Sequence, residues 1–348
     1  MAVGGAGSCT ENVEDPVTSK CAGNRLLRAV LIRIALCFAM SAALAQTVEQ
    51  SSKTSLVPQT GFDTPQKAAQ AVIKACETYD VATLVQIFGA GSKDLITTAD
   101  PVQDKNRAEA FAAKAQEKES VALDPKNSAR ATLFVGNNDW PFPVPIVKRG
   151  SKWYFDAREG HNEILYRRIG SNELDAIQVC RGFVEAQKEY ASEIHDDSGV
   201  NQYAQRIIST PGKRDGLYWQ NTDGTSGGPI SEAVAHAIQE GYVPGQSSGY
   251  HGYYFKVLKG QGSAAPLGEL DYVIKGIMIG GFALVAFPAE YRVTGVKTFI
   301  VSNTGVVYQK DLGADTVGIA KVMDRYNPDK TWHRTNDQWP ADVSVSGY

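Results

Sequence analysis

Residues 158–192 read REGHNEILYRRIGSNELDAIQVCRGFVEAQKEYAS, and this segment sets the architecture of the chain. Its apolar side chains recur at helical spacing over about nine turns. The apolar stripe consists of Ile164, Leu165, Ile169, Leu174, Ile177, Cys180, Val184 and Tyr190. Gly170 interrupts it, and glycine is a poor helix former. We therefore expect two helices or a kink at Gly170, with the junction between two domains close by.

Upstream, residues 62–160 are predicted to form a small α+β domain. Thr64 followed by Pro65 marks a helix start, because a hydroxyl can cap the first turn and proline presets φ at the first helical position. Further helices are predicted from residue 80 to Gly89 and over residues 104–117. Alternating apolar residues predict a curved antiparallel sheet with a hairpin turn at Arg149-Gly150, built from strands at residues 121–123, 132–135, 142–147 and 152–155.

The strand predicted at residues 142–147 contains an unusual proline pattern. Pro141, Pro143 and Pro145 alternate with apolar residues, so the missing N–H groups would all lie along one side of the strand. A central strand could not lack three of the backbone N–H donors that its hydrogen bonds to both neighbouring strands require. The pattern therefore predicts an edge strand whose outer side is blocked.

Downstream, residues 161–325 are predicted to form a second α+β domain, in which a long helix packs on an antiparallel sheet. A helix is expected over residues 231–239, and Asn303-Thr304-Gly305 reads as the last hairpin turn. The strands are predicted at residues 253–258, 282–287, 296–301 and 306–309, and residues 326–348 as a C-terminal tail. The predicted fold class is thus α+β throughout.

The first 45 residues carry an export signal. Arg25 and Arg28 precede, and Arg33 interrupts, an apolar stretch over residues 30–44 that closes on Ala43-Leu44-Ala45, as a cleavable signal peptide does. The alternative, a single membrane anchor, is disfavoured because the stretch is shorter than the roughly 20 apolar residues that span a bilayer. We predict cleavage after Ala45, a flexible leader over residues 46–61, a periplasmic or secreted location, and no stable membrane span after cleavage.

Charge and cysteine content narrow the function further. The formal net charge is −3, and the body of the chain has no Lys/Arg block, so nucleic-acid binding is not expected. Of five cysteines, only Cys76 and Cys180 lie beyond the signal. In an oxidising compartment they could form one disulfide, but both lie on apolar helix faces, so two buried thiols are almost equally expected.

Four segments of the chain together carry a family resemblance: Trp140-Pro141-Phe142-Pro143, Arg167-Arg168-Ile169-Gly170-Ser171-Asn172-Glu173-Leu174, Gly249-Tyr250-His251-Gly252-Tyr253-Tyr254-Phe255 and Val293-Thr294-Gly295-Val296-Lys297-Thr298-Phe299. They resemble a bacterial domain-of-unknown-function family, number 2950. The resemblance covers residues 62–324 and implies an exported protein without an established activity. It supplies no catalytic residues.

The C-terminal half also resembles, more weakly, the globular part of type IV pilin-like and pseudopilin-like proteins. The resemblance rests on one helix, Gly252-Tyr253-Tyr254-Phe255, Phe282-Ala283-Leu284-Val285-Ala286, and Thr294-Gly295 leading to Phe299. Pilins carry an apolar N-terminal helix, whereas the helix near Leu174 is internal and amphipathic. The resemblance therefore implies docking to an envelope partner, and no place in a pilus core.

One candidate catalytic pair is Ser247 and His251. Gly245-Gln246-Ser247-Ser248-Gly249 has the spacing of a nucleophile elbow, and a serine nucleophile needs a base within hydrogen-bond reach. An elbow, however, requires a strand before it and a helix after it, and here a strand follows. We favour a Gly/Ser loop at residues 245–249 and a locally bonded histidine, with catalysis as the alternative.

Trp219, Tyr218 and Tyr250 are the candidate binding residues, because exposed aromatic rings in Gly-rich loops can contact a glycan or a peptide. Asp215 and Asp223 lie beside glycines, but a calcium-loop pattern is missing, so turn chemistry is favoured. No metal or cofactor is expected. The sequence predicts a non-catalytic binding or adaptor module for an envelope protein or wall polymer, with a secreted hydrolase using Ser247 and His251 as the alternative.

Overall fold

The computed structural model describes residues 58–98, 100–196, 198–240 and 249–336. Apart from Pro58, these residues belong to one compact unit, Gln59–Tyr348. The predicted signal peptide, Ser247 and the last twelve residues lie outside the described part. Helices and antiparallel sheets alternate along the chain, so the fold is α+β, as predicted. Within the described residues, no helix combines the length and apolar character that a bilayer-spanning helix needs.

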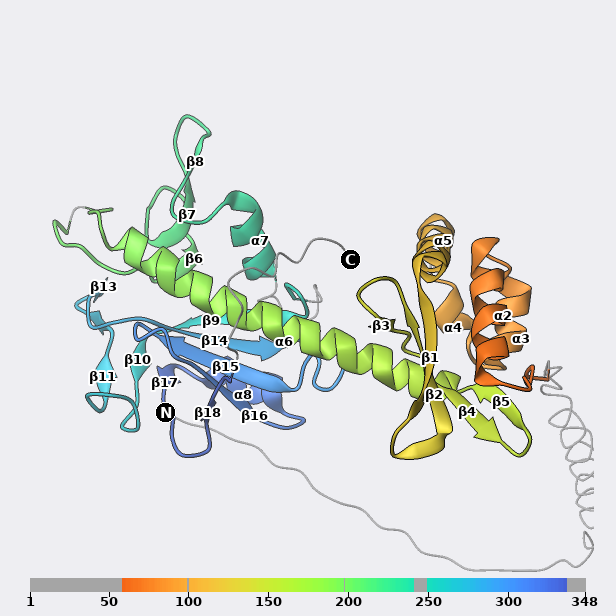
Figure 1. The fold of residues 1–348 in the computed structure, drawn as a ribbon. Coiled ribbons are helices and arrows are strands. Elements are labelled where there is room, and N and C mark those ends of the chain that lie inside the picture. The colour runs from red at the N-terminus through yellow and green to blue at the C-terminus, as the bar shows by residue number, and fades with distance from the viewer. Residues whose placement is uncertain (1–57, 99, 197, 241–248, 337–348) are drawn as a thin grey trace, which may run out of the picture. The chain divides into compact units, whose positions relative to one another are not determined.

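The N-terminal elements enclose a first hydrophobic cluster, which includes Leu84, Phe88, Leu133, Ile146, Trp153 and Phe155. They are α2 (Pro65–Glu77), α3 (Val81–Phe88), α4 (Lys93–Ile96), α5 (Pro101–Glu117), β1 (Glu119–Asp124), β2 (Asn127–Val135), β3 (Trp140–Pro141), β4 (Ile146–Arg149) and β5 (Lys152–Phe155) (Figure 1). The Thr64 hydroxyl accepts the Lys67 N–H at 3.2 Å, which confirms the predicted start of α2.

The structure corrects the prediction of a proline-bearing edge strand. The sheet order is β1-β2-β4-β5, and β3 pairs with β2 beside this path. Pro143 and Pro145 lie in the connection between β3 and β4, outside any strand. Because the prolines occupy that connection, β4 keeps its N–H groups and pairs with both β2 and β5. The alternation that looked like an edge strand is a break between two short strands.

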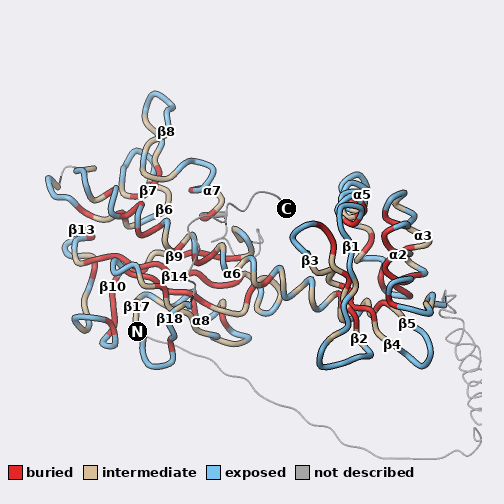
Figure 2. The backbone as a smooth tube through the Cα atoms, in the orientation of Figure 1, coloured by how far each residue is buried: buried red, intermediate tan, exposed pale blue. Residues whose placement is uncertain are grey.

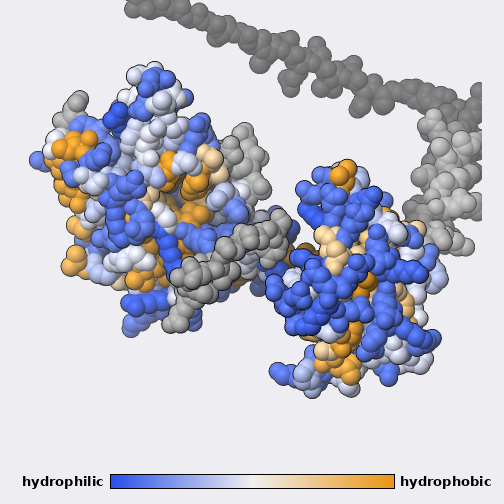
Figure 3. All heavy atoms as spheres, turned by 45° about the horizontal axis from the view of Figure 1, so that its top comes forward, coloured by the Kyte–Doolittle hydropathy of each residue, from blue (hydrophilic) through white to orange (hydrophobic). Residues whose placement is uncertain are grey.

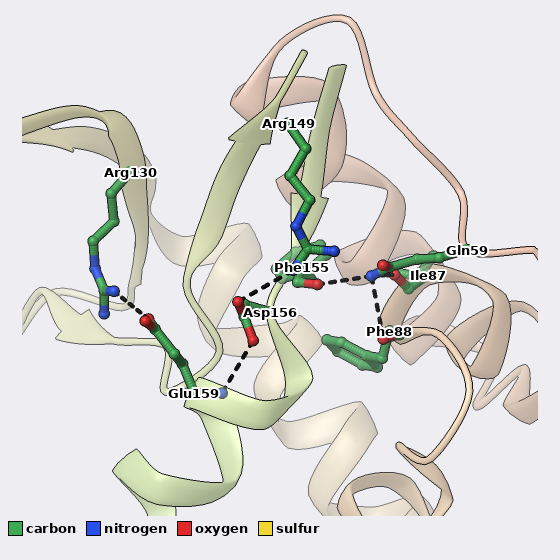
Figure 4. Close-up of polar contacts among 8 residues, drawn as sticks. All are labelled: Gln59, Ile87, Phe88, Arg130, Arg149, Phe155, Asp156 and Glu159. Carbon is green, nitrogen blue, oxygen red and sulfur yellow. Dashed lines mark hydrogen bonds and ion pairs between the residues drawn. The ribbon is translucent and has the colours of Figure 1, made fainter. Parts of the chain in front are cut away.

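Helix α6 (Ala157–Tyr190) is one continuous helix of 34 residues, which corrects the predicted break at Gly170. Its first turn is fixed to the N-terminal sheet (Figure 4): the Asp156 carboxylate accepts the Glu159 N–H at 3.1 Å and the Arg149 guanidinium at 3.2 Å, and Glu159 pairs with Arg130. The Gln59 amide meanwhile donates to the carbonyls of Ile87, Phe88 and Phe155. A single glycine costs a helix only about 1 kcal/mol, which packing at both ends of α6 outweighs.

The second hydrophobic cluster forms where α6 contacts β14 (Ala283–Pro288) and β15 (Lys297–Ser302). These strands belong to an antiparallel sheet of order β18-β16-β15-β14-β9, with β9 spanning Tyr253–Leu258 and β16 spanning Val307–Asp311. Every residue of β14 is buried (Figure 2), and both α6 and α8 (Thr316–Val322) contact this strand. A long helix on an antiparallel sheet is what the sequence predicted.

Shorter elements complete the second cluster. They are β6 (Arg206–Ile208), β7 (Gly216–Gln220), β8 (Ser226–Gly227), α7 (Glu232–Glu240), β10 (Gly260–Gln261), β11 (Leu270–Asp271), β12 (Val273–Ile274), β13 (Ile277–Met278), α8 (Thr316–Val322), β17 (Arg325–Tyr326) and β18 (His333–Arg334). Tyr326 is fully buried and β18 pairs with β16. The packed chain therefore continues beyond residue 325, where the tail was predicted to begin.

Candidate functional site

A cavity with polar walls has a volume of about 720 Å³ and lies beyond the C-terminal end of α6. We call it the polar pocket. It is formed by the loop after α6, the segment entering β6, the turn between β6 and β7, Lys259 after β9, and the β12–β13 turn. Its lining residues are His195, Asp196, Ser198, Gln202, Gln205, Arg206, Gly212, Lys213, Arg214, Asp215, Lys259 and Gly276.

Hydrogen bonds to backbone groups hold these loops together. The buried Gln187 side chain of α6 donates to the Ala204 carbonyl and accepts the Ala204 N–H, both at 2.8 Å. The Gln205 amide donates to the Gly276 carbonyl at 2.7 Å, and the Gln205 N–H donates to the Asp215 carbonyl at 3.0 Å. Helix α6 and the β12–β13 turn thus fix the segment before β6, so the pocket wall is a built structure although it consists of loops.

The two carboxylates that line the polar pocket are engaged by neighbouring groups. Asp196 accepts the Ser198 N–H at 2.9 Å and the Gln202 amide at 2.6 Å, and hydrogen bonds from Ser198 hold the pKa of Asp196 below its usual value. Asp215 accepts the Thr210 N–H at 2.7 Å and the Thr210 hydroxyl at 2.8 Å. Asp215 also lies 3.5 Å from the Arg206 guanidinium.

The cations of the polar pocket outnumber these carboxylates: Arg206, Lys213, Arg214 and Lys259 face two aspartates. Arg214 stacks over the Trp219 ring at 5.4 Å. Among the described residues, neither the Lys213 nor the Lys259 ammonium has a hydrogen-bond or ion-pair partner, and both side chains are exposed. The pocket therefore presents positive charge that the protein does not neutralise itself, which favours an anionic ligand.

An aromatic wall supports one side of the polar pocket. The His195 ring stacks on Tyr190 with centroids 4.0 Å apart and lies 5.3 Å from Trp219. The Tyr190 hydroxyl donates to the Arg214 carbonyl, and burial raises the pKa of Tyr190. Trp219, a predicted binding residue, thus lies behind Arg214 and His195. The sequence segment TPGKRDG, residues 210–216, was the available signal for this site, since it puts two cations on a Pro-Gly turn between strands.

The other two predicted aromatic residues lie elsewhere. Tyr218 is only 4% exposed, so it serves the core and is not a surface contact. Tyr250 packs against the second cluster and lines a small apolar cavity with Phe183 and Ile238. Neither is part of the polar pocket.

His251 has an acidic partner that its sequence neighbourhood did not reveal. Its Nδ1 lies 2.7 Å from a carboxylate oxygen of Asp175, on α6. The residue adopts φ 48°, a left-handed conformation that costs a non-glycine residue free energy. Ser247 lies outside the described residues. Among the described residues, the element before Ser247 is α7 and the element after it is the strand β9, whereas a nucleophile elbow is followed by a helix.

Cys76 and Cys180 are both free thiols, so the alternative of a disulfide between them is wrong. Cys76 belongs to the first cluster and Cys180 to the second. Burial raises the pKa of each thiol to about 12, which makes both unreactive.

Asp223 accepts the N–H and the hydroxyl of Thr225, as turn chemistry requires. In the described part of the chain, no three His, Cys, Asp or Glu side chains converge on a common point.

The chain was compared with protein families, curated proteins and solved structures. A family model described as "Protein of unknown function (DUF2950)" matches residues 59–335, which is most of the chain. No curated protein and no solved structure matches significantly.

Proposed function

This chain belongs to the DUF2950 family, proteins of unknown function, and from its geometry we propose that it is a non-catalytic binding module that takes an anionic ligand group in the polar pocket. In this proposal the protein is exported, and its ligand is an anionic wall polymer. If the protein binds no such polymer, docking to an envelope protein would take the place of the polymer in this proposal.

The observation that supports the proposal is the pair of ammonium groups at Lys213 and Lys259, which have no partner among the described residues. Both side chains are exposed, and the two neighbouring carboxylates are already bonded to Thr210, Ser198 or Gln202. A ligand phosphate or carboxylate would complete the charge balance. Charge-assisted hydrogen bonds from lysine to such groups are stronger than those between neutral groups.

The proposal predicts saturable binding of polyphosphate to the full chain, measured by calorimetry. The double variant Lys213→Glu/Lys259→Glu should bind at least about tenfold more weakly, because each change replaces an attraction with a repulsion. The matched control is Lys74→Glu/Lys330→Glu, which makes the same charge change at two exposed lysines that do not line the pocket. Equal losses in both double variants would mean that net charge and not the pocket controls binding. If the unmodified protein did not bind polyphosphate, the proposal that its ligand is an anionic polymer would be rejected.

A second candidate function, hydrolysis, is favoured by the Asp175–His251 pair. A carboxylate 2.7 Å from Nδ1 orients a histidine so that Nε2 can accept a proton from a serine. Ser247, four residues earlier in the chain, is the candidate nucleophile.

Turnover of 4-nitrophenyl esters discriminates the two functions. Under the binding proposal, the Ser247→Ala variant and the unmodified chain give the same rate, equal to that of buffer. A rate above buffer that falls at least about 100-fold in a folded Ser247→Ala variant would establish the hydrolase instead. Ser248→Ala is the matched control, because it removes a neighbouring hydroxyl from the same loop.

A further inference from the structure

The N-terminal part of the chain contains a second cavity, which we call the apolar cavity. It has a volume of about 240 Å³ and opens among α3, α5, the segment after β3 and Ile164 of α6. Its walls are mostly apolar and include the aromatic residues Phe88, Phe111 and Phe142. It shares no residue with the polar pocket, so its role is independent of the proposed function.

Three aromatic residues of the cavity wall are in contact with one another. The Phe142 ring lies 5.0 Å from Phe111 and 6.3 Å from Phe88, centroid to centroid. Such ring pairs are stable arrangements, so the walls do not need to collapse inward to become stable. Interiors are otherwise close-packed, and an open apolar cavity of this size is therefore a candidate ligand site.

The mouth of the cavity is also apolar. Trp140 is 40% exposed and Ile164 is 41% exposed, and both line the opening. The face shown in Figure 3 is otherwise mostly hydrophilic around α2 to α5, with hydrophobic atoms reaching the surface only in places. The Arg167 guanidinium lies over the Trp140 ring, 5.3 Å from the ring centroid. A ligand that entered would cover apolar surface that water now contacts.

One charge at the mouth is open to a ligand. Asp104 is buried, and its two oxygens accept the Thr98 N–H at 2.6 Å and the Thr98 hydroxyl at 2.9 Å. Arg107, by contrast, is exposed, and among the described residues its guanidinium donates to the neutral side chain of Gln103. A guanidinium bonded only to a neutral group keeps donors available for a carboxylate.

We propose that the apolar cavity binds a small hydrophobic acid, with its apolar body against Phe111 and Phe142 and its carboxylate at Arg107. The volume is below the range of about 300 to 1,000 Å³ that is usual for drug-sized ligands, so the acid is small. Each methylene buried in the cavity should strengthen binding about fourfold until the cavity is full.

The test compares three eight-carbon probes with the full chain, followed by tryptophan fluorescence and calorimetry. Octanoate should bind saturably and tightest, octanol more weakly by at least about tenfold, and octylamine weakest, because only the carboxylate is attracted to Arg107. Equal affinities for all three probes, or tightest binding of octylamine, would overturn the assignment of the anionic end. Absence of saturable binding by all three would overturn the site.

Two variants locate the binding. Ala108→Leu adds a side chain to a residue that lines the cavity, so both octanoate and octanol should lose affinity at least about tenfold. The matched control is Ala110→Leu, an exposed position on the same helix, which should bind as the unmodified chain does. Arg107→Gln, at an exposed position, should bring octanoate down to the affinity of octanol and leave octanol unchanged. Unchanged octanoate binding by either Arg107→Gln or a folded Ala108→Leu would contradict the proposal.

Discussion

Replacing Gln187 by leucine is expected to lower the free energy of unfolding by about 2 to 5 kcal/mol. The Gln187 side chain is completely buried, and its amide bonds both the N–H and the carbonyl of Ala204, itself completely buried. Leucine would leave both backbone groups without a partner in the apolar core. Each unsatisfied buried group costs about 1 to 3 kcal/mol, and the apolar gain of leucine offsets part of this.

The same variant tests how the polar pocket is held. Ala204 lies between Gln202 and Gln205, which line the pocket, so loosening it should also weaken polyphosphate binding. Urea unfolding followed by circular dichroism measures the first effect, and calorimetry the second. Gln178→Leu is the control, because Gln178 is exposed on the same helix and the change there should alter stability by less than about 0.5 kcal/mol. Similar losses in the two variants would mean that helix propensity, and not the bond to Ala204, is responsible.

Replacing Gly216 by alanine is expected to cost about 2 to 4 kcal/mol. Gly216 is buried at the start of β7, where it pairs with Arg206 of β6. An added Cβ would lie 2.6 Å from the Ser209 nitrogen and 2.7 Å from the Ile208 carbonyl carbon. Because both are backbone atoms, the clash cannot be relieved by a rotamer change, and β6 must move away from β7.

The contrasting substitution is Gly170→Ala in the middle of α6. No atom lies within 4 Å of a Cβ at Gly170, so alanine fits there and should raise the free energy of unfolding by about 1 kcal/mol. Thermal unfolding of the two variants should therefore shift in opposite directions. If Gly170→Ala were destabilising, α6 would not be the continuous helix described above. If Gly216→Ala were neutral, β6 and β7 would not be in close contact.

Elements with strong local signals followed from the sequence. Thr64-Pro65 predicted the start of α2, and Gly89 the end of α3, because caps act within one turn of the chain. The hairpin turn at Arg149-Gly150 and the bounds of β9 were also correct, since period-two alternation and turn chemistry are local. These interactions involve residues a few positions apart, so the local order of the amino acids is enough to encode them.

Long-range contacts decided the other features. The continuity of α6 through Gly170 depends on packing at both of its ends, and the prolines near Phe142 became a strand break because β4 pairs on both sides. The polar pocket joins residues up to 81 positions apart, from His195 to Gly276, and Asp175 meets His251 across 76 positions. Local propensity contains no information about such distant neighbours. The fold class and the elements with strong local caps and turns could therefore be read from the amino-acid order, whereas the continuity of α6, the cavities and their charges exist only once the chain has packed.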